Sequence, residues 1–505
     1  MTASPVVFVG WGADDRVPGY YAEGKFAQGA ITAASLTKKL LVTGTKIAAG
    51  TATSNQDINQ IFSNDDADAF YGAGSEIARQ CYKALMIPGV TLYGAPATEA
   101  GGAVAGVLTI TLVTNSVASG TYQFWLDGDY YSVSIGATDT ITTIAANIAL
   151  AVNANARGPY TATSAVGVVT ITRKSKGIRG NDGSCFQDTS KCTACTTTFT
   201  LGGGGTALPG AFGGGIRPAT GAGVEVLTTL LAVLFPGTWD YQAWAQNDAA
   251  SLAAVKTQVG TKAGILEGRL EAYGFGANST LAAATSLAQT TLNDFRGNAL
   301  WQINGESHPS EIAASMMSKR AATEGSDPVH VYDGEVLPGI APNRTPADIA
   351  NHATLKSAIN NSVTPLQTVN GAVTCVMLIT TYSLNGSNPD YRCLQSYYVS
   401  MPDYARIDIG LRWTSSIKPA NPRVADDVAS SERQPVAGVW TPNRATRFLV
   451  DLQYEYQGNG WFSNVASFLA TAGFNGAAKR IESIFPCPVT AGDHQFGSSI
   501  RSISQ

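Results

Sequence analysis

The segment KLLVTG at residues 39–44, followed by DDADAFYGAGSEIARQCYKAL at 65–85 and VTLY at 90–93, decides the fold. The first and last pieces are short apolar runs of the length that buried strands have, whereas the middle piece places apolar side chains at helical spacing. A strand, a helix and a second strand in this order begin an α/β domain. The step from Gly72 to Ser75 interrupts the helical pattern, so the helix is predicted to divide there.

The composition is that of a long chain with few charges. A length of 505 residues predicts two to four domains. Charged residues make up 14% of the chain, against about 25% in ordinary soluble domains. A surface with so little self-repulsion suits a protein that packs against copies of itself, although extracellular β-rich proteins share this composition. The sequence therefore favours an assembly protein.

Charge and hydropathy also exclude two classes of partner. The formal net charge of −4 gives no basic stripe of the kind that neutralises phosphates, so we expect no direct binding to nucleic acid. The chain has no run of 18 apolar residues, so we expect no membrane insertion. Residues 1–10 lack the basic start of a signal peptide, and we expect a protein made in a cytoplasm.

The middle of the chain changes character, which predicts an inserted domain. After Gly101 the sequence shows Thr-, Ser- and Val-rich strand patterns, a hairpin turn at Asp127-Gly128 and a helix capped by Thr140. The α/β pattern resumes after Gly215. Because the borders are rich in glycine, we expect this insert to lie on the outer surface and to be removable without unfolding the core.

The predicted fold class is α/β and α+β multidomain, with extended terminal arms. The predicted domains are an N-terminal arm at 1–35, an α/β core at 36–100 and 215–418, an inserted outer α+β domain at 101–214, a C-terminal assembly domain at 419–485 and a C-terminal arm at 486–505.

Both ends of the chain have the character of strands without a local partner. A short apolar run near the N-terminus is separated from other strand patterns by glycine and proline, which suits strand addition to the sheet edge of another subunit, although a disordered terminus is the alternative. The C-terminal stretch has no helical period. The predicted inter-subunit arm contacts are Val6, Val7, Phe8, Val9, Ile500 and Ile503.

Three segments of the C-terminal half are predicted to form two strands and a helix. Residues 447–456 alternate apolar and polar side chains as a half-buried strand does. A helix is predicted over 461–469, and a long apolar strand over 372–381. The residues predicted to form the sheet of the C-terminal domain are Phe448, Val450, Leu452 and Tyr454.

The cysteines and histidines form no recognisable site. Cys192 and Cys195 have the CxxC spacing, but a tetrahedral zinc needs two further ligands and only Cys185 is near in sequence. We interpret the seven cysteines as mostly buried small hydrophobes, with a local disulfide in this cluster as the alternative. The four histidines are far apart in sequence, with no motif around any of them.

Motifs for catalysis are also missing from the sequence. It contains neither a G-x-x-x-x-G-K-[ST] phosphate loop nor a G-x-S-x-G nucleophile elbow. The carboxylates at Asp65, Asp66 and Asp68 lack the order of a calcium loop and are interpreted as residues that stabilise a helix N-terminus. We therefore predict no catalytic, cofactor-binding or metal-binding residues, no cofactor and no enzymatic activity.

Several stretches, in order, resemble the sheath subunits of Mu-like contractile bacteriophage tails. The most specific is Asp68-Ala-Phe-Tyr-Gly-Ala-Gly-Ser-Glu-Ile-Ala78, which is similar to an aromatic-Gly-x-Gly-Ser step leading into a helix in that family. The closing Phe-Arg strand of such relatives is not clear in this chain. The other similar stretches are 16–23 with its Val-Pro-Gly turn, 40–44, 379–391 with Thr-Thr-Tyr and Asp-Tyr, 397–406, 423–427 and 440–442.

This resemblance implies a structural protein of the virion tail, assembled in the host cytoplasm. Sheath subunits of the family stack as hexameric rings around an inner tube, and their arms cross to neighbouring subunits and complete β-sheets there. The implied partners are other copies of the chain, the tail tube protein, and the baseplate and tail terminator proteins. A phage surface adhesin or carbohydrate-binding protein is the alternative, based on Trp125, Tyr130 and Tyr131 of the insert.

Overall fold

The structure, a computed structural model, describes residues 38–208, 214–277, 279–344, 350–420, 422–427 and 438–490. The chain forms two compact units. The described part of the larger unit runs from residue 38 to 325 and from 334 to 396, and that of the smaller unit covers 326–333 and segments from 397 onward. The predicted arm contacts Val6, Val7, Phe8, Val9, Ile500 and Ile503 lie outside the described residues.

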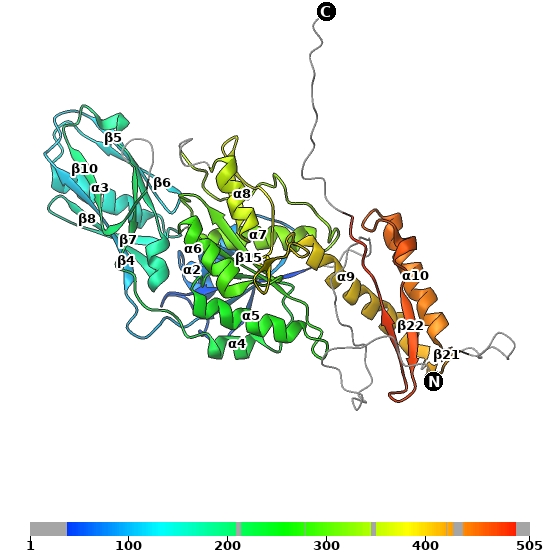
Figure 1. The fold of residues 1–505 in the computed structure, drawn as a ribbon. Helices are drawn as coiled ribbons and strands as arrows, with labels where there is room; N and C mark the ends of the chain where they lie inside the picture. Colours follow the sequence, from blue (N-terminus) through cyan, green and yellow to red (C-terminus); the bar gives the residue numbers. More distant parts are fainter. Residues whose placement is uncertain are drawn as a thin grey trace, which may run out of the picture. The chain divides into compact units, whose positions relative to one another are not determined.

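An eight-stranded sheet organises the larger unit (Figure 1). Its strand order is β17-β16-β15-β14-β13-β1-β3-β2; the edge strands β2 and β17 pair antiparallel with their neighbours, and the others pair parallel. The strands predicted at 39–44 and 90–93 are confirmed as β1 and β3. The bounds are β1 Lys39–Thr45, β2 Asn59–Ile61, β3 Thr91–Ala97, β13 Tyr241–Trp244, β14 Ala272–Ala277, β15 Gly297–Gln302, β16 Thr364–Val369 and β17 Ala372–Cys375.

Helices cover both faces of this sheet. Tyr273 and Phe275 of β14 share a hydrophobic core with Leu252 of α5, whereas a Cβ atom added at Gly274 would meet Met317 of α7. Because side chains alternate along a strand, α5 and α7 lie on opposite faces, and α7 comes close because glycine leaves room. The helices are α1 Asn64–Tyr71, α2 Glu76–Leu85, α4 Thr228–Leu234, α5 Ala249–Ala263, α6 Leu281–Thr285 with a π-helical continuation Ser286–Leu292, α7 Pro309–Thr323 and α8 His352–Asn360.

The predicted break between the first two helices is confirmed. Ser63 caps α1 and Ser75 caps α2, each through a side-chain oxygen that accepts a hydrogen bond from a backbone amide of the first turn. Gly72 has φ +81°, a left-handed conformation that glycine adopts without steric cost. The Gly-x-Gly-Ser step therefore ends one helix and starts the next.

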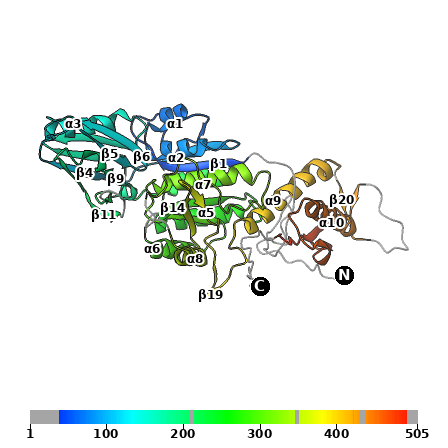
Figure 2. The same ribbon diagram turned by 90° about the horizontal axis from the view of Figure 1, so that it is seen from above.

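Between β3 and β13 the chain forms a β-rich body, residues 105–218, called the insert below. It contains a four-stranded antiparallel sheet, β10-β4-β8-β7, and a five-stranded one, β11-β12-β9-β5-β6, with one helix, and it has its own hydrophobic core. In Figure 2 the β5–β6 hairpin lies beside α2. The bounds are β4 Ala105–Val113, β5 Gly120–Leu126, β6 Asp129–Ile135, α3 Ile141–Ala154, β7 Tyr160–Ala165, β8 Val168–Lys176, β9 Cys185–Asp188, β10 Thr198–Gly202, β11 Gly204–Leu208 and β12 Gly215–Pro218.

Local predictions for the insert are confirmed in two places and corrected in a third. The hairpin turn at Asp127 and Gly128 has φ values of +49° and +84°, as a tight two-residue turn requires. Thr140 caps α3 through its hydroxyl. The glycine-rich border predicted near the end of the insert, however, is not a linker at residues 202–205: Gly202 ends β10, and Gly204 and Gly205 belong to β11.

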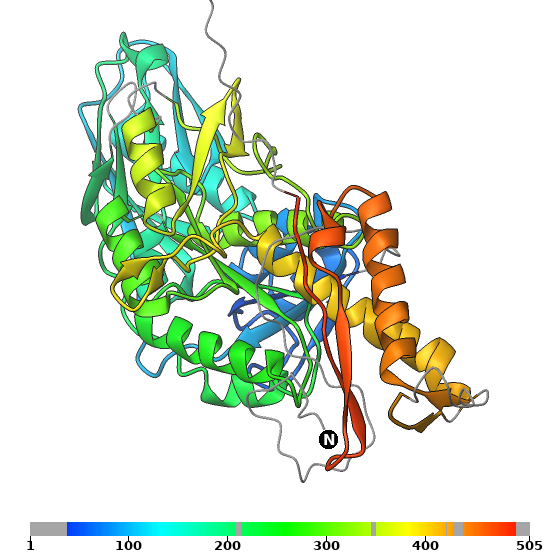
Figure 3. The ribbon, with the colours of Figure 1, turned by 45° about the vertical axis from the view of Figure 1, so that its right-hand side comes forward.

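Two helices and a hairpin form the smaller unit. Helix α9 (Tyr397–Arg412) contacts α10 (Pro442–Gly458) through hydrogen bonds from Arg412 to Glu455. The hairpin of β22 (Thr471–Asn475) and β23 (Arg480–Ile484) packs along α10, as Figure 3 shows in red and orange. Helix α9, which the sequence assigned to the core, therefore lies in the smaller unit.

The strand predicted over 447–456, with Phe448, Val450, Leu452 and Tyr454 on a sheet, is wrong: these residues lie in helix α10. Pro442 occupies the first turn, where a missing N–H costs nothing. The buried side chains Ala445, Leu449, Leu452 and Tyr456 follow the i, i+4, i+7, i+11 spacing of a helix face. A period of 3.6 therefore describes this segment better than the alternation of its middle residues.

Two further expectations need correction. The helix predicted over 461–469 is only a 3₁₀ turn, Val465–Ser467, and the strand predicted over 372–381 ends at Cys375 because the chain then turns into a loop that pairs through an isolated bridge at Ile379. The remaining described short elements are β18 Leu384–Asn385, β19 Asn388–Pro389, β20 Arg423–Val424, β21 Val439–Trp440, the 3₁₀ turns Ile178–Asp182, Ser190–Cys192 and Lys418–Ala420, and the π-helix Trp413–Ile417. Among the described residues, no helix combines the length and hydropathy needed to span a membrane.

Candidate functional site

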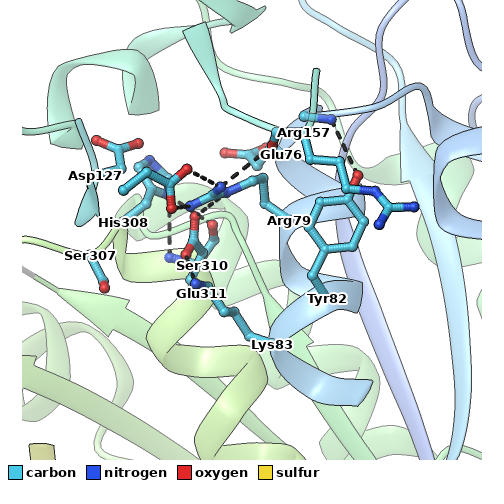
Figure 4. A network of polar contacts seen from close by, with 12 residues as sticks. Glu76, Arg79, Tyr82, Lys83, Asp127, Arg157, Ser307, His308, Ser310 and Glu311 are labelled. Carbon is cyan, nitrogen blue, oxygen red and sulfur yellow. Dashed lines mark hydrogen bonds and ion pairs between the residues drawn. The ribbon is translucent and has the colours of Figure 1, made fainter. Parts of the chain in front are cut away.

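The most concentrated polar chemistry in the larger unit lies where the insert meets the α/β sheet, and this region is called the joint below (Figure 4). From the sheet side, α2 and the N-terminal end of α7 provide charged side chains. From the insert, the β5–β6 turn, β8 and the 3₁₀ turn Ile178–Asp182 provide the opposing ones. Nearly all of these side chains are buried.

Arg179 lies at the centre of the first ion cluster. Its Nε and Nη2 atoms donate to the two carboxylate oxygens of Glu76 at 2.8 and 2.7 Å, and Nη2 also donates to Glu225 at 3.0 Å. Glu76 also accepts a hydrogen bond from the amide of Thr45 at 3.0 Å. Bidentate pairs between a guanidinium and a carboxylate are among the strongest hydrogen-bonded contacts in proteins, so this cluster fixes the 3₁₀ turn of the insert against α2.

Arg79 makes a second link across the joint. Its Nε donates to Glu311 of α7 at 2.7 Å, and its Nη atoms donate to both carboxylate oxygens of Asp129 at 2.5 and 3.2 Å. Lys83, one turn further along α2, lies 3.2 Å from the second oxygen of Glu311. One arginine thus joins α2, α7 and the first residue of β6.

A third buried pair supports the joint from inside the insert. Arg173 of β8 donates to Asp127 at 2.5 Å, and the Tyr160 hydroxyl and the Ser184 amide donate to the other oxygen of Asp127 at 2.9 and 2.7 Å. Asp127 is therefore both a turn residue with positive φ and a buried carboxylate with each oxygen bonded. The hairpin cannot shift without breaking these contacts.

His308 connects the sheet side to the insert through both ring nitrogens. Its Nε2 lies 3.0 Å from the carbonyl oxygen of Arg179, and its Nδ1 lies 2.7 Å from the Ser310 hydroxyl in the first turn of α7, the helix that His308 caps. A carbonyl oxygen can only accept, so Nε2 carries a hydrogen, whereas the Ser310 amide can only donate and lies 3.4 Å from Nδ1, which is therefore the acceptor. The geometry therefore selects the neutral imidazole.

The charges of the joint have shifted pKa values. Burial acts to raise the pKa of Glu76, but the charge and hydrogen bonds of Arg179 outweigh it and hold that pKa at about 2. Arg173 and Arg79 likewise lower the pKa of Asp127 and Glu311 against the effect of burial. For His308, burial and the charge of Arg173 lower the pKa, while Asp127 and Glu76 oppose them.

The joint is a structural site and not a catalytic one. Ser310, His308 and Asp127 supply the residue types of a hydrolytic triad, but each is about 1% exposed. His308 also cannot act as the base of a triad, because its Nε2 is already bonded to a backbone carbonyl. A cleft of about 970 Å³ lies elsewhere, lined by residues that include Arg217, Thr280 and Asn304, and none of the three triad-like residues lines it.

Less buried contacts surround the joint. The guanidinium of Arg344 lies 3.7 Å from the ring centre of Trp125 and bonds to Glu306 at 2.6 Å. Arg157, after α3, pairs with Asp68 of α1 at 2.7 Å and is substantially exposed. These contacts extend the attachment of the insert beyond the buried clusters.

The cysteines singled out by sequence lie in the hydrophobic core of the insert. Cys185, Cys192 and Cys195 are all buried there, which confirms that they act as small hydrophobes. Burial raises the pKa of Cys185 and Cys192 to about 12, so both thiols are protonated near neutral pH and react slowly.

The sequence analysis missed the joint entirely. Its bonded members are separated by up to 232 positions in the chain, and no local motif marks them. One signal was present: Glu76, Arg79 and Lys83 occupy the helix next to the Gly-x-Gly-Ser step in a chain that is otherwise poor in charge. These charges could be recognised as internal only once the fold shows their partners.

Comparison with known proteins gives one sequence relative and several structural neighbours. No protein-family model matches the chain. It is 25% identical over 169 residues to a Mu-like prophage tail sheath protein of Haemophilus influenzae, which is 33% of this chain and 34% of that protein. The match thus spans about a third of the length of that relative.

Solved structures of sheath proteins are also similar to this chain. A sheath tail protein from Desulfitobacterium hafniense is 11% identical with a TM-score of 0.45, over 91% of this chain and 93% of that chain. One from Listeria innocua is 11% identical with a TM-score of 0.46, over 88% and 90%. The contracted sheath complex of an extracellular contractile injection system is 8% identical with a TM-score of 0.46, over 96% and 98%.

This sequence relative is a protein of the kind that the ordered motifs predict. The resemblance to Mu-like tail sheath proteins that the sequence predicted is confirmed by this relative, to which the chain is similar over 169 residues.

Proposed function

We propose that this chain is the structural subunit of a contractile tail sheath. In this proposal, hexameric rings of the chain polymerise helically around a tail tube and contract to drive the tube through a host envelope. The observation that carries the proposal is the sequence likeness to a Mu-like prophage tail sheath protein, together with the order of the sheath-like motifs. Such a subunit needs no active site, and the buried joint described above provides none.

The smaller unit offers a place where neighbouring subunits could pair. Among the described residues, the hairpin of β22 and β23 is a two-stranded sheet without a third strand. A two-stranded sheet is marginal by itself, and its outer edges are templates for added strands. Phe468, Leu469 and Ile484 at this hairpin are all more than 40% exposed. We infer that arms of neighbouring copies, containing Val6–Val9 and residues near Ile500 and Ile503, add strands to it.

Strand addition explains how a sheath could rearrange and stay connected. Main-chain pairing holds the subunits together while their bodies rotate, and alternating side chains provide specificity. Contraction requires no nucleotide if the shorter state forms more favourable contacts between subunits. The further partners in this proposal are the tail tube, baseplate and tail terminator proteins, and the location is the virion tail.

The arm proposal is tested by electron microscopy of the purified chain. The substitutions Val7→Asp and Val9→Asp place two charges on one face of the predicted N-terminal strand and should abolish hollow helical cylinders, because a charged strand cannot be buried against a partner sheet. The control Thr2→Asp with Ala3→Asp adds the same charges outside the apolar run and should assemble normally. Normal cylinders from the first variant would contradict the proposed arm contacts, and their absence from the unmodified chain would contradict the sheath function.

The alternative of a carbohydrate-binding protein finds no support in the insert. Tyr131 is buried, and Trp125 is covered by the guanidinium of Arg344. Of the three aromatic residues that suggested this function, Tyr130 alone is exposed. A sugar-binding platform of exposed rings is therefore not formed by these residues.

A further inference from the structure

The imidazole ring of His308 has two roles: it caps α7, and it bonds to the insert across the joint. Nδ1 accepts from the Ser310 amide at 3.4 Å and lies 2.7 Å from the Ser310 hydroxyl, while Nε2 donates to the Arg179 carbonyl across the joint. The ring is about 1% exposed, so water cannot replace either partner. Any change in the protonation of this ring therefore acts on both sides of the joint at once.

The surroundings of His308 contain charges of both signs. From α2 they are Glu76 and Arg79; from the β5–β6 turn, Asp127; from β8, Arg173; from the 3₁₀ turn, Arg179 and Asp182; and from α7, Glu311. The carboxylates of Glu76, Asp127 and Glu311 already have arginine partners. A further positive charge on the ring would therefore enter a buried site that already contains the three arginines bound to these carboxylates.

We propose that the joint is an acid-sensitive latch: with neutral His308 it holds the insert and the α/β sheet as one rigid body, and protonation of His308 loosens the insert. The proposal concerns the isolated chain and does not depend on the sheath assignment. It also replaces the expectation of a detachable insert on glycine linkers, because the attachment is made by buried charges and not by the chain borders.

Protonation acts through Nδ1. A proton taken from solvent occupies the Nδ1 lone pair, so the ring donates to the Ser310 hydroxyl 2.7 Å away and no longer accepts the Ser310 amide hydrogen 3.4 Å away, which costs the start of α7 its cap. The new cation is buried near Arg173, and it is not compensated by water. Both effects are relieved if the joint opens and the ring becomes hydrated.

The direction of the pH effect follows from the lowered pKa of His308 in the closed joint. In an opened joint the ring regains an ordinary pKa of about 6.5, so the open state binds the proton at a higher pH than the closed state. Acidification below this value therefore favours opening, by up to about tenfold per pH unit until the closed state is also protonated. Glu76, with its pKa at about 2, stays charged over this range and does not contribute.

Amide hydrogen exchange of the full chain tests the latch. The segments to follow are 173–184 in the insert and 308–314 at the start of α7, at pH 7.5 and 5.5, with exposure times corrected for intrinsic exchange. We expect protection in both segments to fall by up to about tenfold at the lower pH, while α5, which lies away from His308 in sequence and on the other face of the sheet, keeps its protection. Equal protection at both pH values would overturn the proposal.

Replacing His308 with a residue that does not titrate tests whether this ring causes the pH dependence of exchange. His308→Asn keeps a side-chain acceptor for the Ser310 amide without a titratable ring, and His308→Gln is a second variant if the first does not fold. Either variant should remove the pH dependence of both segments. The matched control is His352→Asn at the exposed start of α8, which should behave as the unmodified chain. A pH dependence that persists in the His308 variants would assign it to another group and overturn the role of His308.

Discussion

The joint of the larger unit and the helical pair of the smaller unit use the same residue types in opposite ways. At the joint, Arg179 and Glu76 are each about 3% exposed and bond in a bidentate manner. In the smaller unit, Arg412 and Glu455 also form a bidentate pair, but their side chains are 34% and 45% exposed. The first pair is shielded from water and salt, and the second is not.

This difference bears on what each region can do. A buried ion pair fixes one geometry, because separating its members leaves a charge without water or partner. An exposed pair can separate and rehydrate at little cost, so its region can adapt to a neighbouring molecule. We therefore expect the joint to be rigid at neutral pH and the smaller unit, with its two-stranded hairpin, to adjust when subunits assemble.

The largest expected effect comes from breaking the buried cluster. Arg179→Gln leaves Glu76 and Glu225 buried without their arginine partner, and we expect a loss of about 3–5 kcal/mol in the stability of the larger unit. Scanning calorimetry measures this as a lower transition temperature of that unit, with the transition of the smaller unit as an internal reference.

The control for this substitution lies on the same joint. Arg157→Gln removes an ion pair with Asp65 and Asp68 whose arginine is 41% exposed, and it should leave the transition unchanged. Equal effects of the two substitutions would remove the distinction between buried and exposed pairs on which the comparison depends.

Local features of the fold could be predicted because each is decided by residues close in sequence. Ser75 caps α2, Thr140 caps α3, and the Asp127-Gly128 turn forms the hairpin, all as the local chemistry indicates. In α10, however, Val450 to Tyr454 alternate in hydrophobicity over a window too short to separate a period of 2 from one of 3.6. Extending the window to Ala445 and Tyr456 would have favoured the helix.

The candidate site could not be predicted, for a different reason. Arg79 and Glu311 are 232 positions apart, and Arg179 and Glu76 are 103 apart, so their pairing depends on how the insert folds back onto the sheet. Nothing local distinguishes a buried carboxylate such as Glu76 from a solvated one at a helix start. Only the tertiary fold identifies which of the few charges in this chain are internal.

The second-largest expected effect concerns α10, the helix that forms where the sequence predicted a strand. Leu449 is buried in α10 and Tyr454 is 47% exposed. Leu449→Ala should therefore destabilise the smaller unit by about 2–4 kcal/mol through the cavity it leaves. Tyr454→Ser should change its stability by about 0.5 kcal/mol or less. A large effect at Tyr454 with none at Leu449 would favour the strand and contradict the helix, and calorimetry of the smaller unit's transition distinguishes them.

The smallest expected effect concerns the exposed pair itself. Arg412→Gln removes the bonds to Glu455 and one to Asp408, and because the guanidinium is about one-third exposed we expect a loss of only about 0–1 kcal/mol, smaller still at high salt. Asp408 keeps its bond from the Tyr456 hydroxyl, so its carboxylate is not left without a donor. The measurement is the transition temperature of the smaller unit at low and high salt. A loss comparable to that of Arg179→Gln, and insensitive to salt, would show that this pair is as shielded as the joint and that the two regions do not differ in rigidity.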